Sequence, residues 1–195
     1  MTAINIVLTH ETAHLFCDSK AAFNGLHLAE VVKCLPVPHL NAAIATRGEA
    51  RALAAVHMMA SNAATLADLR KQLPVALRLA AKTDDTFLRA AGGELDVFVI
   101  AYERKPSAFA IFTHSKHGYA PYSIVEIEGG AFTPTIPTAR FNRLQSEHAG
   151  PAIGLAALHI QSETDPLTVG GHAQETIVDE GGIHTRTLGK LGSNA

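Results

Sequence analysis

The chain contains 195 residues, and 47% of them are hydrophobic, which is enough to bury the core of one domain. Its 16 basic and 18 acidic residues are spread along the sequence, so no basic run marks a surface for nucleic acid or for an anionic membrane. The sequence also lacks a membrane-spanning apolar run and a secretory signal, and we therefore expect a soluble, cytoplasmic protein.

The N-terminal part alternates short apolar runs with polar turns, a pattern that predicts strands. Residues 3–9 and 13–18 are expected to form an antiparallel hairpin. After a loop at residues 24–25, the runs at 31–37 and 41–46 are expected to form a second pair of strands. Four strands would then precede the first helix.

Two helices are predicted next. Residues 48–63 are rich in Ala, Leu and Met and suit a buried helix. The second helix is expected over residues 65–82, because Thr65 and Asp68 have the spacing of a capping box, with Pro74 as a kink.

The second half of the chain is predicted to return to strands, with one helix at 152–161 after a Gly-Pro pair and a frayed tail at 190–195. The expected strands lie at residues 95–102, 108–114, 122–128, 173–178 and 184–188. The order of strands, two helices, strands, helix and strands predicts a single α+β domain over residues 1–195. In it, two central sheets would lie between helical layers.

Histidines are numerous but poorly spaced for a metal site. His10 and His14 flank a polar turn without an HExxH order, and His114 and His117 flank another turn. We expect solvated imidazoles in the first turn and no dedicated metal site in either. The two cysteines lack CxxC spacing, which argues against a zinc site or a disulfide framework and fits a reducing compartment.

Thr2 follows Met1 at the head of the first predicted strand. Removal of Met1 would give Thr2 a free α-amine, whose pKa is typically about 7.7 to 8.0. Such an amine can accept the proton of the hydroxyl group on the same residue, which creates a nucleophile together with its base. Threonine is also common at this position, so Thr2 alone allows an ordinary structural reading.

Three further motifs stand at related places. Asp18-Ser19-Lys20-Ala21 ends the second predicted strand, Lys33 opens the third, and Ala45-Thr46-Arg47-Gly48 leads from the fourth strand into the first helix. Together with Thr2, these motifs resemble the N-terminal nucleophile (Ntn) hydrolases, in particular the proteasome β subunits and their bacterial HslV-type relatives. Lys33 lies one residue earlier than in that family, which we interpret as a deletion in the loop at 24–25.

The resemblance implies a role for each residue. Thr2 would be the nucleophile, Lys33 would stabilise developing negative charge on its oxygen, and Asp18 would hold the Lys33 ammonium group in place. Backbone N–H groups around Arg47 and Gly48 would form an oxyanion hole. Taken singly, Asp18 and Gly48 can be turn residues and Lys33 an exposed strand residue.

The C-terminal part resembles the family less. Asp165 and Thr168 keep the family spacing of two polar residues that support the terminal amine, but Val169 is inserted before the two glycines. Ser146 is the only loose match to a further supporting serine. The stretch from residue 133 to 165 looks too short for two helices. The implied fold is therefore a four-layer αββα sandwich with a shortened C-terminal helical layer.

The implied activity is that of a proteasome-like threonine peptidase or amidohydrolase, which needs no cofactor. Peptides or unfolded proteins would be its substrates. Family members form homo-oligomers, as rings or open assemblies, and a separate unfoldase is compatible with the resemblance, although nothing in this sequence names one. The alternative is a catalytically inactive scaffold subunit of the same fold.

Overall fold

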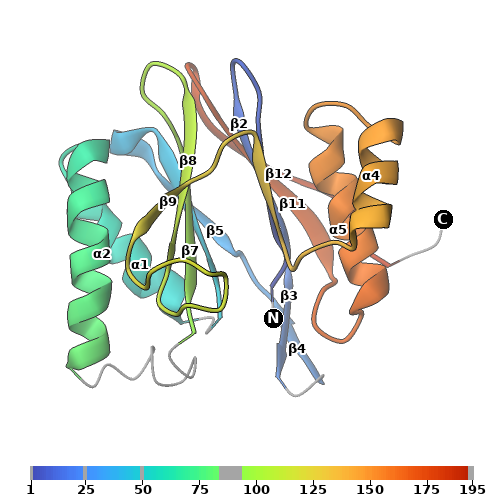
Figure 1. Ribbon diagram of the computed structural model, residues 1–195, viewed down its shortest axis with the longest axis horizontal. Helices are drawn as coiled ribbons and strands as arrows, with labels where there is room; N and C mark the ends of the chain where they lie inside the picture. Colours follow the sequence, from blue (N-terminus) through green and yellow to red (C-terminus); the bar gives the residue numbers. More distant parts are fainter. Residues whose placement is uncertain (1, 24–25, 49–50, 84–93, 193–195) are drawn as a thin grey trace.

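The computed structural model describes residues 2–23, 26–48, 51–83 and 94–192. Over these residues the chain is a mixed α/β protein whose sheets are antiparallel. Two sheets face each other, and helices cover the outer face of each, as Figure 1 shows. None of the described helices combines the length and the apolar character that a membrane crossing requires.

Each large sheet has five strands, and a separate hairpin extends from one of them. The strands of sheet 1 are, in spatial order, β10 (Gly130–Thr133), β1 (Ile4–Leu8), β2 (Ala13–Asp18), β11 (His172–Asp179) and β12 (Gly182–Lys190). The strands of sheet 2 are β5 (Cys34–Val37), β6 (Ala42–Arg47), β7 (Asp96–Tyr102), β8 (Pro106–Phe112) and β9 (Ile124–Glu126). The hairpin consists of β3 (Lys20–Phe23) and β4 (Leu26–Glu30), and the short 3-10 helix η1 (Pro38–Leu40) joins β5 to β6.

The space between the sheets is filled by every second residue of the central strands. Ile4 and Ile6 of β1 pack in one cluster with Phe98 and Ile100 of β7. This follows from the period of a strand, which places residues i and i+2 on one face. The first residues of β1 therefore belong to the centre of the molecule.

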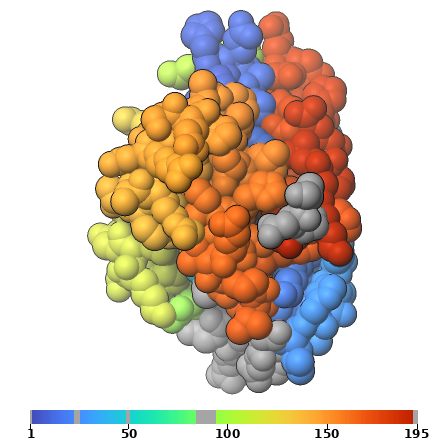
Figure 2. Space-filling view, turned by 90° about the vertical axis from the view of Figure 1, so that its right-hand side faces the viewer, coloured from blue at the N-terminus to red at the C-terminus, as the bar shows by residue number. Residues whose placement is uncertain are grey.

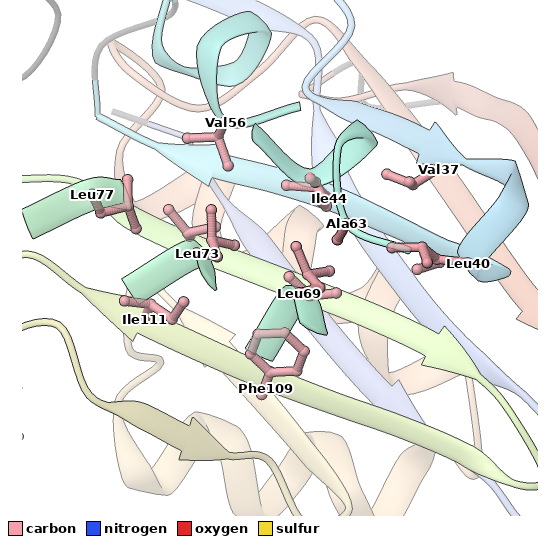
Figure 3. Packing of buried hydrophobic residues seen from close by; sticks show 14 of the residues in the cluster. Val37, Leu40, Ile44, Val56, Ala63, Leu69, Leu73, Leu77, Phe109 and Ile111 are labelled. Atoms are coloured by element: carbon pink, nitrogen blue, oxygen red, sulfur yellow. The ribbon is translucent and has the colours of Figure 1, made fainter. Parts of the chain in front are cut away.

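Two helices, α1 (Ala52–Ser61) and α2 (Leu66–Lys82), cover sheet 2. The predicted cap of α2 is confirmed, because the Asp68 N–H group donates to the Thr65 hydroxyl at 3.0 Å. The helix continues through Pro74, so the proline does not end it. Leucines at positions 69, 73 and 77 lie on one helix face and point toward Ile44, Phe109 and Ile111 of the sheet (Figure 3).

Two helices, α4 (Thr138–Glu147) and α5 (Ala152–Thr164), cover sheet 1. Figure 2 shows them side by side across this face of the molecule. The prediction of a single helix in this layer is therefore wrong. The reason is that α4 is mostly polar and buries only Leu144, so its sequence contains no apolar run.

Close contacts fix α5 against the first two strands. Gly154 lies so near Phe16 of β2 that a Cβ atom at this position would stand 2.2 Å from the ring. Asn5 of β1 donates to the Gly154 carbonyl at 3.2 Å and to Gln161 Oε1 at 2.9 Å. Gln161 donates back to Asn5 Oδ1 at 3.0 Å, so the two buried amides satisfy each other.

Two other expectations about the N-terminal half are wrong. Six strands, not four, precede the first helix, because β3 and β4 form a hairpin in the stretch that was expected to be a loop. All residues of β4 are exposed, so it has no alternation to detect. The expected solvated imidazole at His14 is in fact buried and bonded to Glu175 at 2.8 Å, because β2 pairs with the distant β11.

Packing of α2 gives a first prediction. Leu73 is 1% exposed against sheet 2, and Leu73→Ala should lower the free energy of unfolding by about 2 to 5 kcal/mol through lost burial and a cavity. Val75, on the same helix, is 61% exposed, and Val75→Ala should change the free energy of unfolding by less than about 0.5 kcal/mol. Urea unfolding of both variants measures the difference, and equal losses would contradict this packing.

Candidate active site

The register of the first hairpin brings Thr2 and Asp18 together. Ile4 pairs with Cys17, so the residues before Ile4 lie beside the end of β2. The N–H group of Ala3, the first peptide group after Thr2, donates to Asp18 Oδ1 at 2.9 Å. Asp18 is fully buried, and Thr2 is only 8% exposed. The chain next to Thr2 is thus held by a buried carboxylate.

Lys33 approaches the same carboxylate from the other sheet. It stands directly before β5, and its Nζ atom lies 2.8 Å from Asp18 Oδ1. The ammonium group also donates to the carbonyl of Lys20 at 2.6 Å. The structure therefore joins Thr2, Asp18 and Lys33 in one cluster, although they come from three separate segments. We call these three residues the Thr2 cluster.

Burial determines the proton affinity of Lys33. It lowers the pKa of the Lys33 ammonium group below its ordinary value, while the charge and hydrogen bond of Asp18 act in the opposite direction. Buried lysines with a lowered pKa exchange protons more readily near neutral pH than exposed ones. The cluster can therefore supply positive charge or a proton close to Thr2.

A glycine segment after α5 completes the surroundings of Asp18. The Gly170 N–H group donates to Asp18 Oδ2 at 3.1 Å, and the Gly170 carbonyl accepts from the Lys20 N–H group at 3.1 Å. Gly171 has φ +75°, and a Cβ atom there would stand 2.4 Å from Ser19 Oγ. Only glycine fits both the backbone conformation and this approach.

The two polar residues before the glycines bind each other and shape this segment. Asp165 ends α5, and the Thr168 hydroxyl donates to its carboxylate. Val169, the inserted residue, is buried in the core between sheet 1 and α5. The insertion therefore fills a core position, and the following Gly170 still reaches Asp18. Asp165 and Thr168 thus belong to the loop that leads to Gly170, and their role as supporting residues stays a prediction.

Ser146 lies elsewhere. It is exposed on α4, and its hydroxyl donates to the Arg143 carbonyl at 2.7 Å within the same helix. We therefore leave Ser146 out of the candidate site.

Arg47 is the last residue of β6, an inner strand of sheet 2, and Gly48 follows it. The Arg47 guanidinium group contacts Asp96 of β7 at 3.1 Å. Gly48 has φ +135°, and a Cβ atom there would lie 2.7 Å from the carbonyl oxygen of Glu94. Residues 49 and 50, which follow this turn, lie outside the described residues. The oxyanion hole at Arg47 and Gly48 stays a prediction.

Both cysteines lie in the core between the sheets. Burial raises the pKa of the Cys34 thiol to about 11 and also raises that of Cys17. Thiols of such high pKa are protonated at neutral pH and are poor nucleophiles. Neither thiol is therefore a good candidate for a nucleophile.

The sequence did not indicate two features of this region. Backbone groups of Ala3, Lys20 and Gly170 bind the Asp18–Lys33 pair, and backbone donors leave no residue-type signal. Beside them, Glu30 accepts from Ser19 Oγ at 3.2 Å and also binds His172. The paired glycines at 170–171 were the one available sign that this loop passes close to another segment.

No protein-family model matches the chain, and no curated protein matches it at a significant level. The resemblance to the Ntn hydrolases therefore stays a prediction from the sequence.

The Asp18–Lys33 pair gives the second prediction. Asp18→Ala leaves the Lys33 charge buried without its partner, which should cost about 3 to 5 kcal/mol of folding free energy. Glu147→Ala removes one member of an exposed pair with Arg143 on α4 and should cost about 0.5 kcal/mol or less.

The double variant Asp18→Ala/Lys33→Met removes both charges but keeps a long side chain at position 33. It should recover part of the lost stability, because no charge then remains buried. Urea unfolding measures all of these variants. If Asp18→Ala lost no more folding free energy than Glu147→Ala, the Asp18–Lys33 pair would contribute no more to stability than an exposed ion pair.

Proposed function

We propose that this protein is a proteasome-like threonine peptidase whose nucleophile is the hydroxyl group of Thr2. The observation that carries the proposal is the contact of Lys33 with Asp18, one peptide group away from Thr2. The helix, sheet, sheet, helix order supports the finer proposal of an Ntn-type αββα sandwich. A cytoplasmic location is part of the same proposal.

The proposed reaction begins when the α-amine of Thr2 accepts the hydroxyl proton and the oxygen attacks an amide carbonyl carbon. Negative charge then develops on the carbonyl oxygen, where the backbone N–H groups at Arg47 and Gly48 are proposed to donate. The C–N bond breaks, the leaving amine takes the proton, and an ester on Thr2 remains. Water hydrolyses this ester. Lys33 stabilises negative charge at the Thr2 oxygen during both steps.

A homo-oligomer is also proposed. Leu26 and Leu28 of β4 are 69% and 67% exposed, and Val32, directly after this hairpin, is 56% exposed. Apolar side chains gathered on a projecting hairpin suit contact with another protein surface. A second copy of the chain is the partner that the family resemblance implies.

The alternative is a scaffold subunit without activity. The Asp18 carboxylate is already bound by Lys33, Ala3 and Gly170, and Thr2 is 8% exposed, so the cluster is also a complete structural unit. The two proposals differ in whether Thr2 carries a free amine. Met1, which decides this, lies outside the described residues.

The third prediction tests the nucleophile directly. Intact mass of the protein made in its native host should show loss of Met1. A threonine-directed epoxyketone should then add once per chain, and Thr2→Ala should abolish the addition. Quantitative retention of Met1 would support the scaffold instead, and labelling that survives Thr2→Ala would place the nucleophile elsewhere.

The fourth prediction concerns Lys33. Lys33→Ala should slow epoxyketone labelling by about 10²-fold or more, whereas Lys71→Ala, which removes an exposed lysine of α2, should not change the rate. The labelling rate should fall on the alkaline side as Lys33 loses its proton. Because burial lowers its pKa, the fall should occur below the value of about 10.4 that exposed lysines have. A rate independent of Lys33 would exclude its proposed role.

A further inference from the structure

A second group of polar side chains lies at the edge of sheet 2. Asp96 is the first residue of β7, and His114 and His117 belong to the turn after the neighbouring strand β8. Strand pairing brings them together, since Asp96 stands directly opposite Phe112 and the chain turns just beyond it. Asp96 is 2% exposed, whereas His117 reaches the surface.

The donor atoms of this group converge. His114 Nε2 lies 2.8 Å from Asp96 Oδ1, and His117 Nε2 lies 3.6 Å from Asp96 Oδ2. One ligand atom from each residue can be chosen so that all three lie within 4.8 Å of one another. Ligands of a tetrahedral zinc ion, at about 2.0 to 2.1 Å from the metal, stand about 3.3 Å apart. No other group of three His, Cys, Asp or Glu donors meets this condition in the described part of the chain.

We propose that Asp96, His114 and His117 form a binding site for a divalent first-row transition metal such as Zn²⁺. Two imidazoles and one carboxylate are a ligand set that such ions use when one or more positions stay open. The open positions would be filled by water or by another ligand. A cavity of about 230 Å³ bordered by His117, Phe112 and Tyr119 provides room for one.

The surroundings favour an ion over a plain hydrogen-bonded cluster. His117 Nε2, at 3.6 Å, is beyond hydrogen-bonding distance from the carboxylate toward which it is directed. Phe112 holds its ring in place, with the two ring centroids 4.7 Å apart. The Arg47 guanidinium group lies 3.1 Å from Asp96 Oδ2 and repels a cation at that oxygen, so metal binding there has to displace this contact.

Metal binding at His114 Nε2 requires two local changes, and the first is loss of the 2.8 Å hydrogen bond from this nitrogen to Asp96 Oδ1. The Lys116 N–H group now donates to His114 Nδ1 at 3.2 Å, so that nitrogen acts as an acceptor. A metal on Nε2 moves the ring proton to Nδ1, and this long hydrogen bond must open. The backbone amide of Lys116 therefore reports on the site.

The fifth prediction uses the full chain without a purification tag and freed of metal with a chelator. Zn²⁺ titrated by calorimetry at pH 7.5 should bind once per chain. Co²⁺ should give the visible absorption of a site of low coordination number. The amide signal of Lys116 should shift on Zn²⁺ addition in a nitrogen-correlated NMR spectrum.

Variants assign the metal to these residues. His117→Ala should weaken Zn²⁺ binding by about 10-fold or more, and His117→Asp, which keeps a ligand, should restore most of it. His148→Ala, which removes an exposed histidine beyond α4, is the matched control and should bind like the parent. Absence of saturable binding, or full affinity in His117→Ala, overturns the proposal.

The proposed metal site uses none of the residues of the Thr2 cluster, although Arg47, which is proposed for the oxyanion hole, contacts Asp96. Thr2 lies at the start of sheet 1, and none of the three ligands belongs to the Thr2 cluster. Thr2→Ala should therefore bind Zn²⁺ with unchanged affinity. Failure of epoxyketone labelling and failure of Zn²⁺ binding are thus separate results.

Discussion

The contact between the Asp18 carboxylate and the Lys33 ammonium group joins the two sheets at the end where the chain begins. Neither charge would be stable alone at this depth, since removal of an ion from water costs several kcal/mol even in a relaxed protein. The remaining hydrogen-bonding capacity is taken up by backbone groups of Ala3 before β1, of Lys20 at the start of β3 and of Gly170 in the loop after α5. A buried ion pair of this kind selects one arrangement of these segments, because a shift of any of them would leave a charge without a partner.

This constraint also explains why the glycines follow α5. The loop must place one N–H group on Asp18 and then pass Ser19 at a distance that excludes a side chain. Val169 shows how the loop tolerates an extra residue relative to the family pattern, because the added side chain enters the core while the next peptide group keeps its hydrogen bond. The backbone contact is therefore retained although the spacing in the sequence is not.

Local sequence signals predicted the elements whose burial is regular. The strand at 13–18, the helix with its cap at Thr65 and the helix beginning at Ala152 after a Gly-Pro pair are rich in buried residues, and they form as expected. The exposed strand β4 and the polar helix α4 were missed because neither buries a stripe of apolar residues. Their formation depends on a neighbouring strand or helix, which a local pattern does not reveal.

The residues of the two candidate sites also differ in whether a sequence pattern could indicate them. Thr2, Asp18 and Lys33 could be proposed because a family pattern supplied their spacing, whereas the backbone partners of Asp18 have no pattern of their own. The group at Asp96 was not anticipated, and His114 and His117 were judged only by their spacing to each other. Their third partner lies on the adjacent strand, so only the pairing of β7 with β8 brings it near.

The contact of Gly154 with Phe16, together with the amide pair of Asn5 and Gln161, has a consequence for the order of events during synthesis. The N-terminal strand leaves the ribosome first and meets Asp18 early, but its contact with Gly154 and the contact of Asp18 with Gly170 need residues more than 140 positions later. The proposed nucleophile thus acquires its surroundings only after nearly the whole chain has been made. Until then, the site proposed at Thr2 would be incomplete in a nascent chain.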